Sequence, residues 1–402
     1  MKTVAIITEY NPFHLGHLWQ LKQVKERFGE DCRVIILMSG HFVQRGEPAI
    51  MSREARTTLA LEAGASLVLE IPLAFATASA RDFADGAVRL LSATGVCQDL
   101  VCGAESAELA AELRPLAEVL LSEDEEYRGL LTEELAAGRS FAAAREQAIL
   151  KLNPAKAELW GRFFRKPNNI LALEYQLAIM RENTRRAAAG RKSKLRLQLL
   201  ERVGDDRAQE VSTSEFASAT AIRRILSETS SSAARLLALE TLVPSYTLSA
   251  LLSQPLVVFK TSTQTAIASL LARTPAELLP FRYFEEGLAA RLLQAAETLG
   301  NLGSAAEADF WALARTRYYA QTRLQRAVLS WQLGLRQELW EQIQADGPAF
   351  IRVCGCDKHG RYLLRLMRKL ATLPRIDKNS DLLEVPGTAL ASARAQQTLA
   401  LT

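Results

Sequence analysis

Short apolar runs alternate with helically spaced apolar positions through the first hundred residues. Residues 3–7 form a β-branched apolar run that is typical of a buried strand. After a turn at Asn11-Pro12, apolar side chains recur every three residues from Leu15 to Val24, which predicts a helix. The same alternation predicts further strands at 33–38, 67–70 and 99–102, and helices at 52–64 and 80–93.

Strands that alternate with helices of this length form a parallel sheet with right-handed crossovers. We therefore expect an α/β fold with a doubly wound, Rossmann-like sheet. In such sheets ligands bind outside the carboxyl ends of the strands. Three loops would meet at that edge, namely the loop before His17, the loop Ser39–Pro48 and the loop at Gly103.

The second half of the chain follows a different pattern. Helical spacing dominates from about residue 106 to Asn168, and a late strand is expected at 195–203. Beyond Pro244-Ser245 the sequence is rich in Ala, Leu, Arg and Gln. We therefore predict a catalytic domain over residues 1–243 and a mainly helical, basic domain over residues 244–402.

Charge and composition narrow the class of protein. From residue 241 onward, 18 Lys and Arg stand against 13 Asp and Glu, whereas the preceding part holds 31 against 32. A basic second half suits a polyanionic partner, although solvated helix faces have the same composition. Apolar runs stay far below the ~20 residues that span a bilayer, so no membrane contact is expected. Five cysteines and the absence of a signal-peptide pattern favour the cytoplasm.

The segment His14-Leu15-Gly16-His17 carries the first candidate chemistry, because it lies where a strand gives way to a helix. The N-terminus of a helix favours phosphate, and imidazoles can donate hydrogen bonds to phosphate oxygens as charge develops on them. Gly16 has no Cβ, so a nucleotide can lie against the backbone. The alternative is a pair of ordinary loop histidines.

A second candidate is Ser218-Ala219-Thr220-Ala221-Ile222-Arg223-Arg224. Small hydroxyl residues before a helix supply donors for phosphates, and Arg223 adds a permanent charge. The alternative is a serine helix cap followed by surface arginines.

Taken together, the two segments resemble the nucleotidylyltransferase superfamily of the H-x-G-H type. The loop from Met38 to Ala49, and the segments Leu67–Pro72 and Lys166–Leu171, are similar to hallmark segments of the bacterial tRNA(Met) cytidine acetate ligase family. The likeness runs from Met1 to about residue 230, and more thinly through Tyr318–Arg326. The lysine-rich loop of synthetases is absent, and Ala104 stands where a serine is expected.

The resemblance implies a reaction and a set of site residues. ATP would activate acetate as acetyl-adenylate, and the acetyl group would pass to N4 of the wobble cytidine of elongator tRNA(Met). His14, His17 and Arg223 would be catalytic, and Mg²⁺ would accompany ATP. It implies ATP contacts from Ile7, Thr8, Glu9, Tyr10, Asn11, Pro12, Phe13, His14, Gly16, His17, Gln20, Gly103, Asn168, Asn169 and Arg223.

Basic clusters next to aromatic residues are candidate RNA contacts. Arg315, Arg317, Arg323 and Arg326 flank Tyr318-Tyr319, and the segments 181–202 and 352–378 each hold eight Lys and Arg against two acids. Solvated helix faces are the alternative for any one cluster. His41, Gln44 and Arg45 are candidates for an acetate pocket or an RNA contact, and an internal Arg45–Glu47 ion pair is the alternative.

Cys354, Cys356 and His359 form an incomplete zinc set, because a structural site usually has four ligands, so no metal site is predicted. The rival functions are a nucleotidylyltransferase that adenylylates a small metabolite, and a tRNA-binding protein without catalysis.

Overall fold

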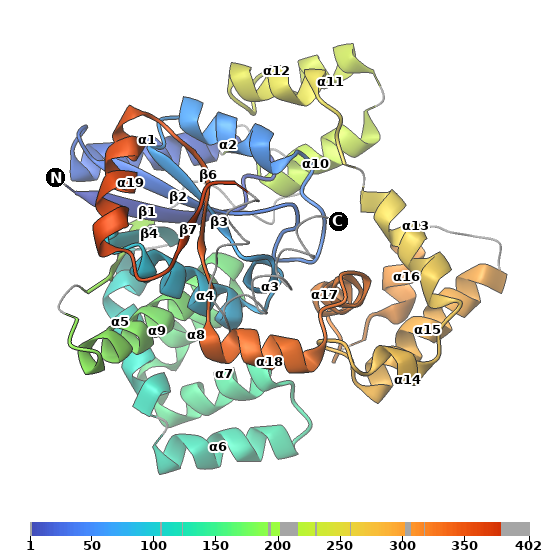
Figure 1. Ribbon diagram of the computed structural model, residues 1–402. Coiled ribbons are helices and arrows are strands. Elements are labelled where there is room, and N and C mark those ends of the chain that lie inside the picture. Colours follow the sequence, from blue (N-terminus) through green and yellow to red (C-terminus); the bar gives the residue numbers. More distant parts are fainter. Residues whose placement is uncertain are drawn as a thin grey trace.

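A computed structural model of the chain describes residues 2–104, 107–122, 124–191, 194–201, 216–229, 231–257, 259–301, 307–316 and 318–378. Within these residues a twisted sheet lies between two layers of helices, and a further group of helices extends to one side (Figure 1). The strands are β1 (Thr3–Thr8), β2 (Arg33–Ser39), β3 (Leu67–Ile71), β4 (Asp99–Ala104), β5 (Arg196–Glu201), β6 (Ile351–Cys356) and β7 (Arg375–Ile376).

Helices cover both faces of this sheet and also form separate units beside it. They are α1 (Leu15–Phe28), α2 (Arg53–Glu62), α3 (Leu73–Ala76), α4 (Ala80–Ala93), α5 (Ala107–Ser122), α6 (Glu125–Ala136), α7 (Phe141–Leu152), α8 (Ala157–Arg165), α9 (Pro167–Ala188), α10 (Ala219–Glu228), α11 (Ser232–Leu239), α12 (Ser245–Ser253), α13 (Phe259–Leu270), α14 (Pro275–Leu278), α15 (Glu286–Asn301), α16 (Glu307–Ala314), α17 (Gln321–Gln332), α18 (Gln337–Asp346) and α19 (Lys358–Leu370).

The sheet confirms the predicted parallel α/β architecture. Its order in the described residues is β5-β4-β1-β2-β3-β6-β7, and the first five strands all run parallel. Since both faces of such a sheet are covered, its strands are continuous apolar runs. In β2, Val34 and Ile36 pack toward α1 and α2, whereas Ile35 and Leu37 pack toward α4 and α9.

The C-terminal part is mainly helical, as expected, and it also adds two strands to the sheet. Strand β6 pairs antiparallel with β3, β7 pairs with β6, and α18 buries Trp340 and Ile343 in the core of the sheet. A separate apolar core lies only within α13–α17, from Ala266 to Val328. After α12 the chain therefore leaves the sheet, builds a helical unit and returns to the sheet through β6 and β7. The local sequence of a six-residue strand such as β6 does not indicate which strand it pairs with.

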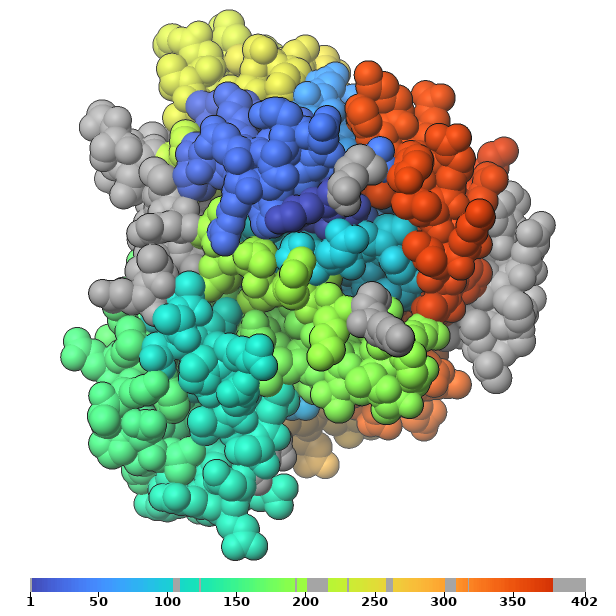
Figure 2. Space-filling model, turned by 90° about the vertical axis from the view of Figure 1, so that its left-hand side faces the viewer, coloured from blue at the N-terminus to red at the C-terminus, as the bar shows by residue number. Residues whose placement is uncertain are grey.

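Helices α5–α8 form another lobe, which packs on α9 around Leu116, Trp160 and Phe163. Figure 2 shows α6 and α7 at one end of the molecule and the α11–α12 pair at the other. Across the described part of the chain, no helix combines the length and apolar character needed to cross a membrane.

Candidate active site

The histidines of the H-x-G-H segment cap the helix that they begin. The Nδ1 atom of His14 accepts a hydrogen bond from the backbone N–H of Gly16 at 3.1 Å. The Nδ1 atom of His17 accepts one from the backbone N–H of His14 at 3.4 Å. A neutral imidazole whose Nδ1 accepts carries its proton on Nε2. Both rings therefore have an Nε2–H group that can donate to a phosphate oxygen.

Close packing holds these rings in place. Their centroids lie 3.7 Å apart in a stacked arrangement, and the ring of Tyr10 meets that of His17 edge-on at 4.8 Å. A Cβ added at Gly16 would lie 3.0 Å from the His14 ring and 3.4 Å from Phe216. A side chain here would press against the capping ring, so glycine suits this position even without a bound nucleotide.

A buried arginine joins the carboxyl ends of β1 and β2. The guanidinium of Arg56, on α2, donates to the backbone oxygens of Glu9 at 2.7 Å, Ser39 at 3.0 Å and Met51 at 3.2 Å, and also to that of Gly40. Arg56 is completely buried, and burial lowers its pKa to about 10. Arg56 was not among the predicted site residues, because a single arginine in an amphipathic helix is typical of a surface position.

Two further hydrogen bonds join the 39–50 loop to the loop between β1 and α1. The backbone N–H of Gln44 donates to Glu9 Oε1 at 2.9 Å, and the backbone N–H of Ile50 donates to Asn11 Oδ1 at 2.7 Å. The predicted convergence of these loops at one edge of the sheet is therefore present. Glu47 accepts from Gln325 Nε2 of α17 at 3.2 Å, so it also contacts the helical unit.

Arg223 brings the third segment to the same edge. Ser218 caps α10, as in the alternative to a phosphate contact, by accepting from the Ala221 N–H at 3.0 Å. Arg223 Nη1 donates to the backbone oxygen of Asn11 at 2.7 Å. Burial lowers the pKa of Arg223, and the nearby Glu47 and Glu9 oppose this effect. Arg224, by contrast, is exposed and lies 3.8 Å from Glu228.

The remaining predicted ATP contacts lie around β4 and the start of α9. Strand β4 pairs with β1, so Gly103 lies at the same edge as Thr8. Asn169 is 2% exposed, and its Nδ2 donates to the Arg162 oxygen at 3.1 Å, whereas Asn168 is only partly buried. Asn168 is therefore the asparagine that is better placed to meet a ligand.

The predicted RNA residues divide into two groups. Arg315 is exposed, and Arg323 pairs with Glu285 at 3.0 Å on the surface. Arg326 turns inward: its Nη1 lies 3.5 Å from the Gln44 oxygen, its guanidinium lies over the Tyr283 ring, and burial lowers its pKa. This burial favours a structural role over the predicted RNA contact. Arg317 lies outside the described residues.

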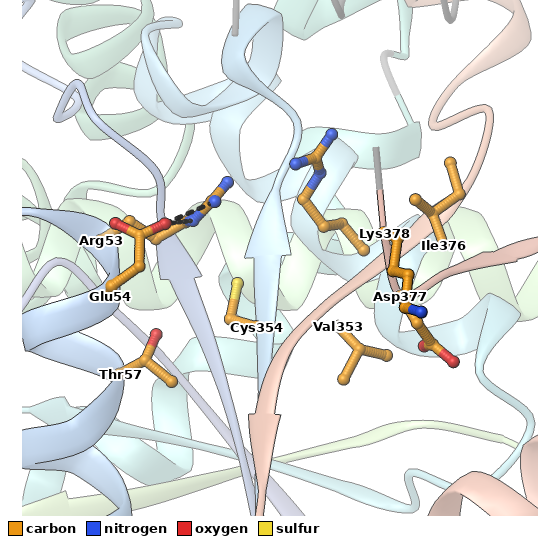
Figure 3. A pocket seen from close by; sticks show the side chains of 9 residues that line it. Arg53, Glu54, Thr57, Val353, Cys354, Ile376, Asp377 and Lys378 are labelled. Carbon is orange, nitrogen blue, oxygen red and sulfur yellow. Dashed lines mark hydrogen bonds and ion pairs between the residues drawn. The ribbon is translucent and has the colours of Figure 1, made fainter. Parts of the chain in front are cut away.

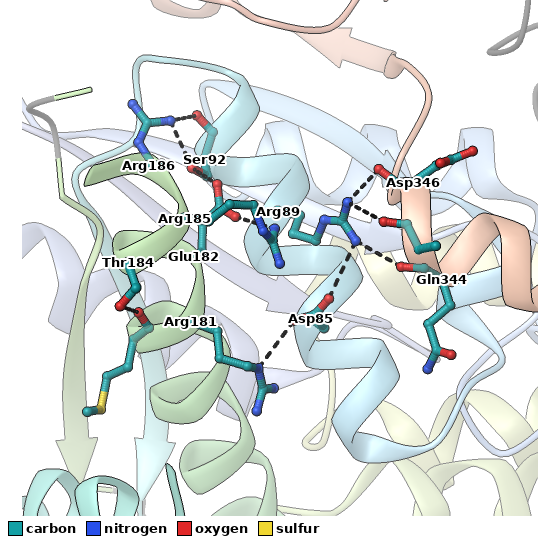
Figure 4. Close-up of polar contacts among 12 residues, drawn as sticks. Asp85, Arg89, Ser92, Arg181, Glu182, Thr184, Arg185, Arg186, Gln344 and Asp346 are labelled. Atoms are coloured by element: carbon teal, nitrogen blue, oxygen red, sulfur yellow. Dashed lines mark hydrogen bonds and ion pairs between the residues drawn. The ribbon is translucent and has the colours of Figure 1, made fainter. Parts of the chain in front are cut away.

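Many cations of the 181–202 segment are engaged within the protein. Arg181 pairs with Asp85 of α4 at 3.6 Å, Arg185 pairs with Glu182 at 2.6 Å, and Arg186 donates to the Ser92 oxygen at 3.0 Å. Figure 4 shows this network linking α9, α4 and the end of α18. These cations serve contacts within the protein, which differ both from the predicted RNA contacts and from the solvated face given as their alternative. On α19, by contrast, Arg361, Arg365, Arg368 and Lys369 are all exposed.

Cys354 lines a pocket of about 250 Å³ beside β6. Figure 3 shows it between the Arg53–Glu54 pair and the Asp377–Lys378 segment. Burial raises the pKa of the Cys354 thiol to about 12, which disfavours the thiolate that metals bind. Throughout the described ranges, no group of three or more His, Cys, Asp or Glu is placed to hold a metal ion.

Comparison with known proteins adds the family. The model of the HIGH Nucleotidyl Transferase family matches residues 1–401. The tRNA(Met) cytidine acetate ligase of Acetivibrio thermocellus is 35% identical over 390 residues, covering 96% of this chain and 90% of that protein. The protein of that name from Thermotoga maritima is 32% identical over 383 residues, covering 92% and 86%.

Solved structures agree with this likeness. The crystal structure of Thermotoga maritima TmcAL in its apo form superposes with a TM-score of 0.88 at 29% identity, covering 99% of this chain and 92% of that one. The same protein bound with alpha-thio ATP gives a TM-score of 0.87 at 30% identity. The chain belongs to the HIGH nucleotidyl transferase family and, within it, to the tRNA(Met) cytidine acetate ligases.

Proposed function

We propose that this chain uses ATP to activate acetate and transfers the acetyl group to N4 of the wobble cytidine of elongator tRNA(Met). The observation that carries the proposal is that His14 and His17 cap the N-terminus of α1 while Arg223 bonds to Asn11, in the loop that leads into this helix. Membership of the ligase family, and a relative's structure with an ATP analogue, support ATP as the nucleotide.

In the first step an acetate oxygen attacks the α-phosphorus of ATP, and the bond from that phosphorus to the bridging oxygen breaks. Pyrophosphate leaves with the electron pair. The Nε2–H groups of His14 and His17 donate to phosphate oxygens as this charge builds. Arg223 supplies a fixed positive charge, and the N-terminus of α1 adds backbone N–H donors.

In the second step the cytidine N4 amine attacks the acetyl carbonyl. The bond to the phosphate oxygen breaks, AMP leaves with the electron pair, and N4 loses a proton. Since that amine is a weak nucleophile, positioning contributes much of the rate. The buried Arg56 and the bonds from Gln44 and Ile50 keep the two loops in register for this purpose.

Mg²⁺ fits the site as a companion of ATP rather than as a resident ion. It is usually bound through one or two carboxylates together with substrate phosphates, and Glu9 is the carboxylate that the first loop provides. When bound, the ion would offset the charge of the triphosphate.

Gln44, Arg45 and His41 remain our candidates for acetate selection. Arg45 and His41 are exposed on the 39–50 loop. Arg315 and Arg323 are our candidates for phosphate contacts with tRNA, and a tRNA substrate implies the cytoplasm.

The test is to incubate the protein with ATP, acetate and tRNA(Met), then digest the RNA and analyse its nucleosides. We expect N4-acetylcytidine only when ATP and acetate are both present, and acetate-dependent pyrophosphate exchange without RNA. ATP turnover with an intact RNA would instead indicate adenylylation of a small metabolite. RNA binding without any exchange would indicate a non-catalytic protein.

A further inference from the structure

A second cavity lies beside the helix that carries Asn168. It has a volume of about 730 Å³, within the range of about 300–1,000 Å³ that small-molecule sites occupy. The starts of α4 and α7, one side of α9 and the end of α18 enclose it, and Figure 1 shows α7 beneath α18. No step of the reaction proposed above involves this cavity.

Glu174 of α9 is an unusual wall residue. It is 4% exposed, and its Oε1 accepts from Arg145 Nη1 at 2.6 Å. Its Oε2 is buried and has no hydrogen-bond partner in the structure. A buried carboxylate oxygen without a donor costs free energy, so a ligand N–H group that reaches Oε2 from the cavity would remove this cost.

Aromatic and apolar side chains form the rest of this wall. Phe141, the first residue of α7, is 54% exposed, and Phe164 of α8 is partly buried. Ile170 and Leu173 of α9 lie between them and Glu174 in sequence and line the same cavity. A flat ring that carries an amine or ring N–H matches this combination, because it can stack on phenylalanine and donate to the carboxylate.

The opposite wall favours an anion. Helices α4 and α7 both begin at the cavity, capped by Ser79 and Ser140, so their positive ends face it. Arg81 is exposed at the same place. Of the acidic residues there, Asp82 is already engaged by Ser79 at 2.9 Å and Gln344 at 2.8 Å, whereas Glu146 has no such bond in the described residues.

Helix α9 links the cavity to the ATP edge. Its buried Tyr175 lies close enough to Glu9 and Cys102 for both to raise its pKa together with burial. Glu174 is the preceding residue, and successive residues of a helix point about 100° apart. One side of α9 thus faces the ATP edge, and the next side faces the cavity.

We propose that this cavity binds an unstacked nucleobase of the RNA substrate and its phosphate, next to the reacting cytidine. The base stacks on Phe141 and donates to Glu174, and the phosphate lies at the starts of α4 and α7. This inference rests on the proposed function, since it assumes that tRNA is the substrate.

The test measures the affinity of tRNA(Met) transcripts by filter binding for Phe141→Ala and Glu174→Gln. Each variant has a matched control: Leu135→Ala removes an exposed apolar side chain of the same lobe, and Glu182→Gln removes a paired carboxylate of the same helix. We expect affinity to fall about tenfold in Phe141→Ala, the scale of one stacked base. It should fall more than twofold in Glu174→Gln, which replaces the charged acceptor by a neutral amide, and change less than twofold in the controls. Acetate-dependent pyrophosphate exchange should remain in all four variants. Its absence from the unmodified protein would refute the proposed function, separately from the binding results.

Abasic substitutions in the anticodon loop, made one position at a time, separate a base from a backbone contact. At one position the missing base should cost the unmodified protein about tenfold and cost Phe141→Ala nothing further. Purely additive losses at every position, or affinities of Phe141→Ala and Glu174→Gln within twofold of the unmodified protein, would overturn the proposal. Cytidine monophosphate that binds as tightly as the RNA, without competing with it, would assign the cavity to a free nucleotide and also overturn it.

Discussion

The imidazole rings of His14 and His17 stack with their centroids 3.7 Å apart, while each Nδ1 accepts a backbone N–H of the same helical turn. The capping bonds and the proposed phosphate-binding role therefore use different atoms of the same rings. This arrangement means that a substitution at either histidine can act through the helix cap, through the chemistry or through both.

Replacing His14 by Asn separates the two effects. Asn is a good helix cap, so unfolding free energy should change by less than about 1 kcal/mol, whereas His14→Ala should lose about that amount. Loss of the Nε2–H donor should slow acetate-dependent pyrophosphate exchange by about 10²–10³ in both variants, the cost of one transition-state donor. Exchange kinetics and urea unfolding measure the two quantities. His359→Asn, on the exposed face of α19, is the control, and normal exchange in His14→Asn would contradict the assignment.

Arg223→Lys tests whether the shape of the cation matters as well as its charge. Lysine keeps the positive charge but cannot bond to the Asn11 oxygen and a phosphate in a fixed fork. We expect the KM for ATP to rise and the exchange rate to fall, with a combined loss of about 10²-fold in kcat/KM. Arg224→Lys, the exposed neighbour, should behave like the unmodified protein. Equal effects of the two substitutions would remove Arg223 from the site.

Arg56→Met should destabilise the protein strongly. The change leaves the backbone oxygens of Glu9, Ser39 and Gly40 without their buried donor, at about 1–3 kcal/mol for each unsatisfied group. We expect the unfolding free energy to fall by about 3 kcal/mol, and the KM for ATP to rise because the loops lose their register. Arg114→Met removes an exposed arginine and should cost less than about 0.5 kcal/mol. Urea titrations of the two variants measure whether Arg56 stabilises the fold or whether, like Arg114, it contributes little to the unfolding free energy.

Charge reversal of Arg323 tests the RNA surface. Arg323→Glu breaks an exposed ion pair with Glu285, which is worth at most about 1 kcal/mol, so folding should survive. We expect weaker tRNA binding and a salt slope reduced by about one unit, as for the loss of one phosphate contact. Arg273→Glu, exposed on the same helical unit, should leave both quantities unchanged. An unaltered slope in Arg323→Glu would place the RNA elsewhere.

Cys354 should react slowly with iodoacetamide in the native protein. Burial raises its pKa to about 12, so at pH 8 its thiolate fraction is about a thousandfold below that of an ordinary cysteine. Because the pKa is raised, reactivity should increase with pH well above pH 9, and unfolding should restore the ordinary rate at pH 8. Mass spectrometry of alkylated peptides measures both, and rapid native alkylation would contradict the burial of this thiol.

Local patterns determined the first strands and the caps of the neighbouring helices. The apolar runs predicted β1 to β4 to within two residues at either end, and Ser52 and Ser218 cap α2 and α10, the second as in the alternative given for that segment. These features depend on side-chain periodicity and on a serine that meets its own backbone, both of which are visible within a few residues of sequence. The H-x-G-H segment was found for the same reason.

Contacts between distant residues were decided only in three dimensions. No local signal marks Arg56 as the donor that joins two strand ends, places β6 beside β3, or turns Arg326 inward while Arg323 stays exposed. Each depends on what the folded chain brings to within hydrogen-bond distance, and burial then decides whether a charge faces water or a carbonyl. The sequence by itself therefore determined the class of fold and the start of α1 at the H-x-G-H segment. The tertiary structure decided which charged side chains are buried to join strand ends and which lie at the surface, because only folding fixes what surrounds them.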